Sequence, residues 1–356
     1  MAQSHAAMYE LTSNQVQAFL RDGFLGPLPA FLPDDELDQI RRELMDVNDH
    51  QRDQPLYGQF VVRDWHLCMP ALNRLFTHPA VYTAVQALLD EESLLLWRSF
   101  LFAKKAGVGE LGWHQEWGYF DGEEIGGKIP SLQPSERYRT GDKAGMPWDL
   151  TVWFALTDVL PDQGPVRFGR GSHKTRYPTK LVPMTECEFF HQISTDLFKL
   201  DDAQEIVRRT RSNRLLLETV NTSSFFDGVD TAKLTAQEAR EIVLARMSQL
   251  EAVVTLPFEI APEDTIEVPM KKGEFVIFYE RTMHGSAANR TDIDRIGVNC
   301  RIVAADTLVY PQRLQGSFID GSGLDISRHW SIPLCGSSRN PANVYSPPDA
   351  AAAGSG

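Results

Sequence analysis

One imidazole and one carboxylate, those of His114 and Glu116, lie two residues apart in a segment typical of a β-strand. Side chains at this spacing leave the same face of a strand, so the two groups converge on one point. A further histidine, His284, comes much later in the chain, just after another strand-like segment. If the three side chains act together, the fold must bring two distant strands side by side.

Two histidines and one carboxylate form the facial triad that holds Fe(II) in non-haem oxygenases, and such a triad leaves open coordination positions. The spacing has a plainer interpretation as well, because most His-x-Glu tripeptides are exposed strand residues. The metal interpretation therefore depends on what surrounds the three side chains.

An arginine supplies part of that context. Arg295 opens the run 295–303, in which apolar and polar residues alternate, as on a strand with one polar face. A polar face beside a metal site indicates a lined cavity. The planar guanidinium suits a carboxylate partner, as 2-oxoglutarate would require at its distal end. Alternatively, Arg295 pairs with Asp292 or Asp294 in a surface turn.

Several motifs in order resemble the phytanoyl-CoA dioxygenase (PhyH)-like family of Fe(II)/2-oxoglutarate oxygenases. They cover the chain in pieces from about Val16 to Val303, at 16–24, 113–117, 151–158, 164–173, 284–286 and 295. Each motif is degenerate by itself, and their order and spacing carry the resemblance.

The resemblance implies a fold, a set of cofactors and a role for particular residues. The fold is mainly β with α, a double-stranded β-helix (jelly roll, cupin-like), and the cofactors are Fe(II), 2-oxoglutarate as co-substrate, and O2. The catalytic iron ligands are then His114, Glu116 and His284. The co-substrate carboxylate is gripped by Arg295, and its neighbours are Ser286, Gln115 and Trp153.

The sequence departs from the family pattern at the carboxylate. The family usually has aspartate where this chain has Glu116, which is one methylene longer. Related oxygenases that resemble clavaminate synthase use His-x-Glu, so iron binding is compatible with the change. Family halogenases have Ala or Gly at this position, and the retained carboxylate argues against halogenation.

Composition favours a single cytoplasmic enzyme domain. The 356 residues are 42% hydrophobic, enough for a sizeable core. The net charge of −13 argues against nucleic acid or an anionic membrane as partner, because binding to phosphates needs a basic surface. The sequence has no apolar stretch long enough to span a membrane and no visible signal peptide, and its four cysteines are scattered, as in reduced proteins.

Helical and strand patterns divide the expected domain, residues 1–340, into parts. A helical layer is expected over about 10–92, a barrel over about 93–180 and 252–310, and a helical insertion over about 181–251. The insertion is expected either to shape the substrate entrance or to form a homodimer interface. The polar loop 121–148 is expected to act as a lid or as an ordered surface loop. Residues 341–356 are expected to be a disordered tail.

Contacts with the primary substrate are the least defined. The candidates are Arg98 and Arg281, which would hold an anionic group, and Tyr119 and Phe120, which would line the cavity. The two arginines have a plainer interpretation as surface ion pairs. The predicted activity is oxidation of an unactivated C–H bond of a small molecule, a specialised metabolite or amino-acid derivative. Hydroxylation is the default, and desaturation, cyclisation and epimerisation remain open. The alternatives are a non-catalytic cupin-like binding protein and a metal-dependent isomerase.

Overall fold

A large antiparallel sheet forms the centre of the computed structural model, which describes residues 10–116, 130–187, 190, 195–214, 220–255 and 258–347. Its strands, in spatial order, are β1 (Phe24–Leu28), β10 (Phe275–Tyr279), β5 (Asp149–Ala155), β12 (Arg295–Ala304), β2 (Leu94–Lys104) and β14 (Ile332–Cys335). The central strand β12 is buried along its whole length. The alternation predicted over 295–303 therefore separates two buried faces.

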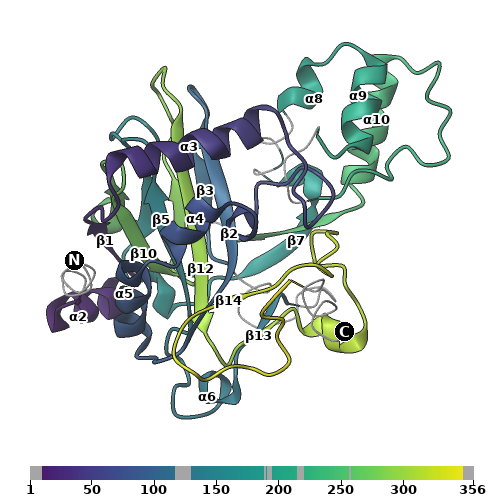
Figure 1. The fold of residues 1–356 in the computed structure, drawn as a ribbon. Helices are drawn as coiled ribbons and strands as arrows, with labels where there is room; N and C mark the ends of the chain where they lie inside the picture. The colour runs from purple at the N-terminus through teal and green to yellow at the C-terminus, as the bar shows by residue number, and fades with distance from the viewer. Residues whose placement is uncertain are drawn as a thin grey trace.

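Helices cover the apolar face of the large sheet (Figure 1). They are α2 (Ser13–Asp22), α3 (Asp34–Asp49), α4 (Pro70–Phe76) and α5 (Pro79–Leu89). A capping box between Thr12 and Gln15 starts α2, and Gly23 ends it in the left-handed conformation with φ of 88°. Ile296 and Val298 of β12 lie in the same apolar cluster as the inner residues of these helices. The expected helical layer is present.

A smaller sheet packs against the other face of the large sheet. Its strands, in spatial order, are β3 (Leu111–His114), β11 (His284–Ser286), β6 (Val166–Gly169) and β9 (Thr265–Val268), all antiparallel. Ring centroids of Phe168 on β6 and Phe278 on β10 lie 5.1 Å apart, so the two sheets are in direct contact. Two facing antiparallel sheets of this kind form a double-stranded β-helix, which confirms the predicted fold class.

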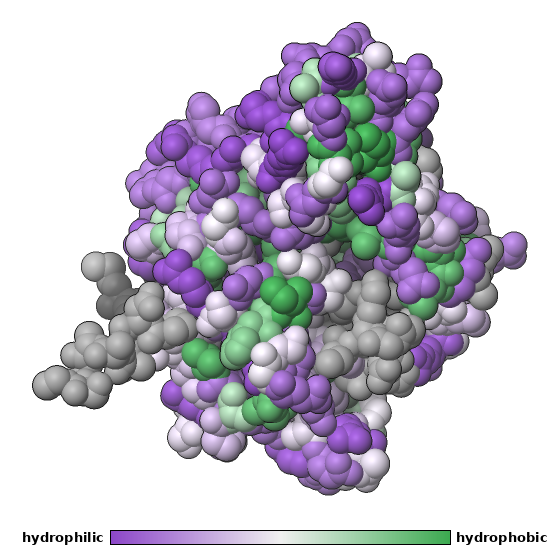
Figure 2. Space-filling model, turned by 90° about the vertical axis from the view of Figure 1, so that its right-hand side faces the viewer, coloured by the Kyte–Doolittle hydropathy of each residue, from purple (hydrophilic) through white to green (hydrophobic). Residues whose placement is uncertain are grey.

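The helical insertion stands on a two-stranded stem and has its own core. Strands β7 (Thr179–Pro183) and β8 (Glu251–Thr255) pair along their whole length, and the segment between them carries α8 (Thr195–Lys199), α9 (Ala203–Arg211) and α10 (Ala236–Met247). Ile206, Phe226 and Val243 belong to an apolar cluster separate from that of the barrel. The insertion projects from the barrel (Figure 1). The face of the molecule drawn in Figure 2 is mainly hydrophilic, with smaller areas of hydrophobic residues.

The loop expected to be a lid is fixed over its second half. Residues 130–148 include β4 (Leu132–Gln133) and α6 (Glu136–Arg139), and β4 pairs with β13 (Leu308–Val309). Tyr138 and Trp148 are buried in an apolar cluster beside β13. This half therefore belongs to the ordered body, whereas residues 121–129 lie outside the described residues.

Three expected boundaries differ from the structure. Strand β1 lies inside the segment expected to be helical; its Gly26 and Pro27 are tolerated because β1 is an edge strand, where a missing N–H disrupts no second ladder. Near the other terminus, β14 extends the barrel beyond residue 310. The expected disorder does not include residues 341–347, because the Asn343 amide bonds the backbone of Val309 and Thr307 at 2.8 and 2.9 Å.

Short 3-10 turns complete the described structure, at Trp65–Leu67, Ser172–Lys174, Met184–Glu186, Pro262–Asp264 and Pro311–Gln315. Within the described residues, no helix has the length and apolar character needed to cross a membrane.

Candidate metal centre

The smaller sheet brings the three predicted metal ligands together. His114 at the end of β3 is the direct partner of His284 on β11, and their ring centroids lie 4.2 Å apart. Glu116 follows on the same side, with Oε1 4.0 Å from Nε2 of each histidine. The three ligand atoms lie within 4.8 Å of one another. Strand pairing therefore brings residues that are far apart in the chain to one point.

Backbone carbonyls orient both imidazoles. His114 Nδ1 lies 2.9 Å from the carbonyl oxygen of Gly112, and His284 Nδ1 lies 2.8 Å from that of Thr282. A carbonyl can only accept a hydrogen bond, so each Nδ1 carries the proton and each Nε2 presents a lone pair. Burial, and then the neighbouring His114, lower the pKa of His284 to about 3, which keeps that ring neutral. These are the conditions that metal coordination requires.

The carboxylate of Glu116 is ionised and held by an arginine. Burial alone would raise its pKa, but Arg301 and the two histidines outweigh burial and lower the pKa to about 2. Nη2 of Arg301 donates to Glu116 Oε1 at 2.9 Å. Nη1 of the same arginine lies 3.5 Å from Oε2 of Glu280, whose pKa burial raises to about 7. Two imidazole nitrogens and an ionised carboxylate thus form a donor set that suits Fe(II).

Two buried cations lie on the inner face of the large sheet. Arg295 is 5% exposed, forms no ion pair with an acidic side chain of the described residues, and has an unpaired Nε. Its cross-strand partner, Lys104, donates to the hydroxyl of Ser286 at 2.9 Å. Ser286 lies two residues after His284 on β11. Buried charges normally have partners, so this pair indicates the binding site of an anionic group next to the metal ligands.

Solved structures that resemble this chain cover most of its length. One, described as "CytC3 with Fe(II) and alpha-ketoglutarate", shares 20% identity at a TM-score of 0.56 and covers 95% of this chain and 94% of that one. Another, described as "non-heme monooxygenase; ThoJ apo", shares 18% identity at a TM-score of 0.54 and covers 94% and 86%. At this identity the resemblance establishes the fold alone. Among curated proteins, none matches the sequence.

A family model decides the assignment. The model described as Phytanoyl-CoA dioxygenase (PhyH) matches residues 19–297, most of the chain. The chain belongs to the PhyH family. Members of this family are non-haem oxygenases that use Fe(II), 2-oxoglutarate and O2, and the resemblance found in the sequence is confirmed.

Trp153 forms part of the predicted co-substrate site of this PhyH-family protein. The Arg295 guanidinium lies 5.1 Å from the centroid of its ring, within the range of a cation–π contact. The ring lies directly over Gly297, where an added Cβ would come within 2.1 Å of it. Glycine at 297 is therefore required for the tryptophan to pack beside the arginine.

Replacing Gly297 with alanine is expected to cost about 1–3 kcal/mol of stability, because the core at this point has no room for a methyl group. Displacement of Trp153 should also weaken 2-oxoglutarate binding. Thermal unfolding and calorimetric titration with the co-substrate would measure the two effects. Gly109→Ala is the matched control, since a Cβ there meets no atom within 4 Å. If Gly297→Ala bound 2-oxoglutarate with wild-type affinity, Trp153 would not contribute to co-substrate binding.

Of the other predicted co-substrate residues, Gln115 contacts the protein backbone. The Gln115 side chain faces away from the metal ligands and bonds three backbone groups, the carbonyls of Thr175 and Arg281 and the N–H of Tyr177. It holds the ligand strand in place, and this geometry does not favour a direct contact with co-substrate. Tyr119 and Phe120 lie outside the described residues.

The two candidate substrate arginines are both accounted for by protein contacts. Arg98 is buried, donates to the Tyr310 hydroxyl at 2.7 Å and lies 3.6 Å from Asp320. Arg281 lies over the ring of Tyr279, with 5.8 Å to its centroid. Neither arrangement favours an anion of the primary substrate as the partner. Arg98 is instead part of a buried polar cluster under the C-terminal segment.

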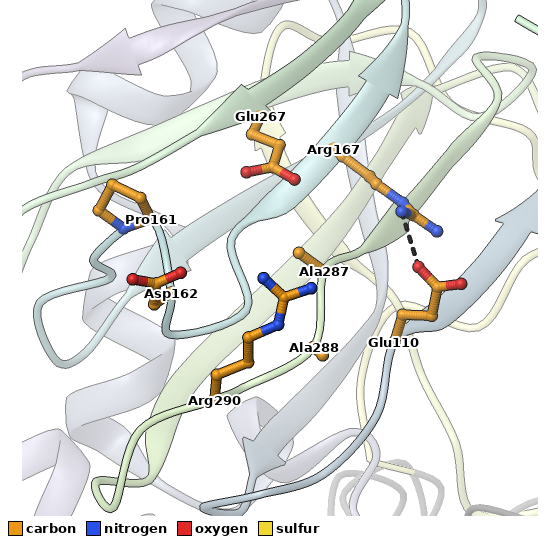
Figure 3. Close-up of a pocket in the computed structure, with 8 residues that line it drawn as sticks. All are labelled: Glu110, Pro161, Asp162, Arg167, Glu267, Ala287, Ala288 and Arg290. Atoms are coloured by element: carbon orange, nitrogen blue, oxygen red, sulfur yellow. Dashed lines mark ion pairs between the residues drawn. The ribbon is translucent and has the colours of Figure 1, made fainter. Parts of the chain in front are cut away.

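A polar hollow of about 400 Å³ lies on the outer face of the smaller sheet (Figure 3). Arg167 in its wall alternates along β6 with the inward-facing Phe168, and it forms an ion pair with Glu110 at 2.8 Å. Asp162, Glu267 and Arg290 complete its charged lining. The predicted metal ligands do not line this hollow, so it is distinct from the candidate metal centre.

Sequence reasoning assigned no role to Lys104 or to Arg301. The alternation over 295–303 places Arg301 on the polar face of its strand but identifies no partner for its side chain. Both residues acquire their contacts through pairing between strands that are far apart in the chain. The only signal in the sequence was a basic residue within a strand-like segment, and such a residue is more often at the surface.

Proposed function

We propose that this PhyH-family oxygenase hydroxylates an unactivated C–H bond of a small specialised metabolite or amino-acid derivative. Its iron ligands would be His114, Glu116 and His284, and its co-substrate would be anchored by Arg295. The convergence of the three donors, together with a buried arginine that forms no ion pair with an acidic side chain of the described residues, carries the proposal. The acidic surface and the large insertion support a small-molecule substrate over nucleic acid.

Each protein group has a defined task in this scheme. The Nδ1–H groups of His114 and His284 stay bonded to backbone carbonyls, so that both Nε2 atoms remain aimed at the metal. Arg295 and Lys104 would hold the distal carboxylate of 2-oxoglutarate from two sides, with Trp153 packed against the guanidinium. When bound, Fe(II) and 2-oxoglutarate supply the oxidation by O2, with release of succinate and CO2. Phe278 packs against this site from the large sheet, with its ring centroid 4.7 Å from that of His284.

The retained carboxylate supports hydroxylation over halogenation, because Glu116 fills the position that a halide would need. Desaturation, cyclisation and epimerisation require the same protein groups, and hydroxylation is the default among them. The expected cytoplasmic location and the expected homodimer stay predictions.

The test is release of succinate from 2-oxoglutarate by the wild-type protein with Fe(II), ascorbate and O2, without primary substrate. An oxygenase releases succinate slowly in this uncoupled reaction, whereas a non-catalytic binding protein takes up iron and co-substrate without turnover. Bound iron with succinate no higher than in the metal-free control would overturn the proposal. A panel of metabolites and amino-acid derivatives would then be screened for compounds that accelerate succinate release, which would identify the substrate. Incorporation of labelled O2 into the product would define the reaction.

The charge of Lys104 should make co-substrate binding depend on pH. Burial, and then nearby Arg295 and Arg167, lower the pKa of Lys104 to about 7. A bound dianion favours the protonated amine, so binding is coupled to proton uptake above that pH. Affinity for 2-oxoglutarate should be constant below about pH 7 and fall above it, by at most about tenfold per pH unit.

Calorimetry in buffers of different ionisation enthalpy would measure this proton uptake directly. Lys104→Met should lower the affinity and abolish most of the pH dependence in this range. If the wild-type protein bound 2-oxoglutarate with equal affinity below and above about pH 7, the Lys104 amine would not take up a proton on binding.

A further inference from the structure

Arg301 presents an electrostatic problem at the proposed metal centre. Its guanidinium is buried and its Nη2 lies 2.9 Å from Oε1 of Glu116, a carboxylate that should bind a divalent cation. A fixed positive charge at this distance competes with the metal for the negative charge and repels the metal itself. Electrostatics alone therefore predicts that Arg301 weakens metal binding, and its presence calls for a compensating role.

The length of the carboxylate side chain suggests that role. Glutamate has one more rotatable bond than the aspartate usual in this family, so an unrestrained Glu116 would sample more positions around the metal. Ordering a free side chain at the moment of binding costs free energy and lowers affinity. A charge-assisted bond from a planar guanidinium restricts the carboxylate before the metal arrives.

Arg301 is itself fixed by its surroundings. Oε2 of Glu280 lies 3.5 Å from Nη1 of Arg301, and the hydroxyl of Thr151 bonds the other oxygen of that carboxylate. Thr151 is also the cross-strand partner of Arg301 in the β5–β12 pairing. The backbone N–H of Glu116 donates to the carbonyl of Glu280 at 3.1 Å. Both the backbone and the side chain of Glu116 are thus tied to the same short segment that leads to His284.

We propose that Arg301 is a positioning residue that fixes the carboxylate of Glu116 for metal binding and so allows this chain to use the longer acid. The inference rests on the proposed function, because it assumes that Glu116 is a metal ligand. It assigns to Arg301 no contact with the substrate or with the reacting atoms.

The two roles of Arg301 predict opposite results for Arg301→Met. A positioning residue, once removed, releases the carboxylate, and the affinity for Fe(II) should fall by about tenfold or more, the usual effect of losing a group that supports a metal ligand. A mere neighbouring cation, once removed, should leave the affinity unchanged or higher. Anaerobic competition with a chromophoric chelator measures the dissociation constant without any turnover, and thermal unfolding of the metal-free proteins checks that each variant is folded.

Arg167→Met is the matched control, because it removes another arginine of the barrel, one that pairs with Glu110 at 2.8 Å instead of with Glu116. It should leave Fe(II) affinity unchanged or slightly higher. Arg301→Lys keeps the charge without the planar fork and should bind Fe(II) with an affinity between those of the wild type and Arg301→Met.

A double-mutant cycle that combines Glu116→Asp with Arg301→Met gives an independent readout. If Arg301→Met does not fold, Arg301→Lys takes its place in the cycle. The shorter carboxylate is withdrawn from Arg301, so a change at 301 should have less effect on Fe(II) affinity in the Glu116→Asp variant than in the wild type. Equal effects in both backgrounds, or undiminished affinity in Arg301→Met, would overturn the inference. Failure of the wild type to bind Fe(II) would instead overturn the proposed function.

Discussion

Replacing His284 with alanine is expected to abolish Fe(II) retention and succinate release together. The ring supplies one of three protein donors, and its loss should cost more than the roughly 10–100-fold in affinity that follows loss of a supporting group. Metal content after anaerobic loading and desalting measures the first effect, and uncoupled succinate release measures the second.

His50→Ala serves as the control for this experiment. His50 is an exposed histidine whose ring contacts Asp46 on α3, a helix that packs on the face of the large sheet opposite the smaller sheet. It should retain wild-type iron content and activity. Undiminished iron in His284→Ala would refute the assignment of this residue, whatever its effect on turnover.

Replacing Arg295 with methionine is expected to weaken 2-oxoglutarate binding and to leave Fe(II) binding intact. Loss of a buried partner in a charged pair costs about 2–5 kcal/mol, which corresponds to a factor of roughly 30 or more. Methionine keeps most of the side-chain volume, so the contact with Trp153 is largely preserved. Titration of the iron-loaded protein with 2-oxoglutarate, and the co-substrate concentration needed for half-maximal succinate release, should both show the change.

The metal-free Arg295→Met protein should also be at least as stable as the wild type. Burial lowers the pKa of Arg295 to about 10, which reflects the cost of keeping inside the barrel a charge that pairs with no acidic side chain of the described residues. An equal loss of iron and co-substrate in this variant would show that Arg295 maintains the structure of the site. In that case the anionic group would need another anchor.

The local patterns that predicted the site were those with a fixed period. The two-residue spacing of His114 and Glu116 placed both side chains on one face without any knowledge of the fold. The alternation over 295–303 likewise placed Arg295 and Arg301 together on the inner face. Both deductions require only that each segment is an extended strand. The aromatic residues of the first segment and the β-branched residues of the second favour that conformation.

Contacts that depend on pairing between distant strands could not be predicted in this way. The partnership of Lys104 with Ser286, and that of Arg301 with Glu116, arises only when β2, β12 and the smaller sheet are in register. Short edge strands such as β1 and β14 were missed for a related reason. They carry too few residues for a period, and pairing with one neighbour defines them.

The two-stranded stem of the insertion allows the insertion to change in evolution independently of the strands that carry the predicted metal ligands. Pro183 and Glu251 are paired at the end of the β7–β8 ladder, so the chain between them leaves and returns at adjacent points. Its length and sequence can vary without moving any strand that carries a metal ligand. Changes in that region should therefore accumulate by drift or recombination while the oxidative chemistry stays unaltered.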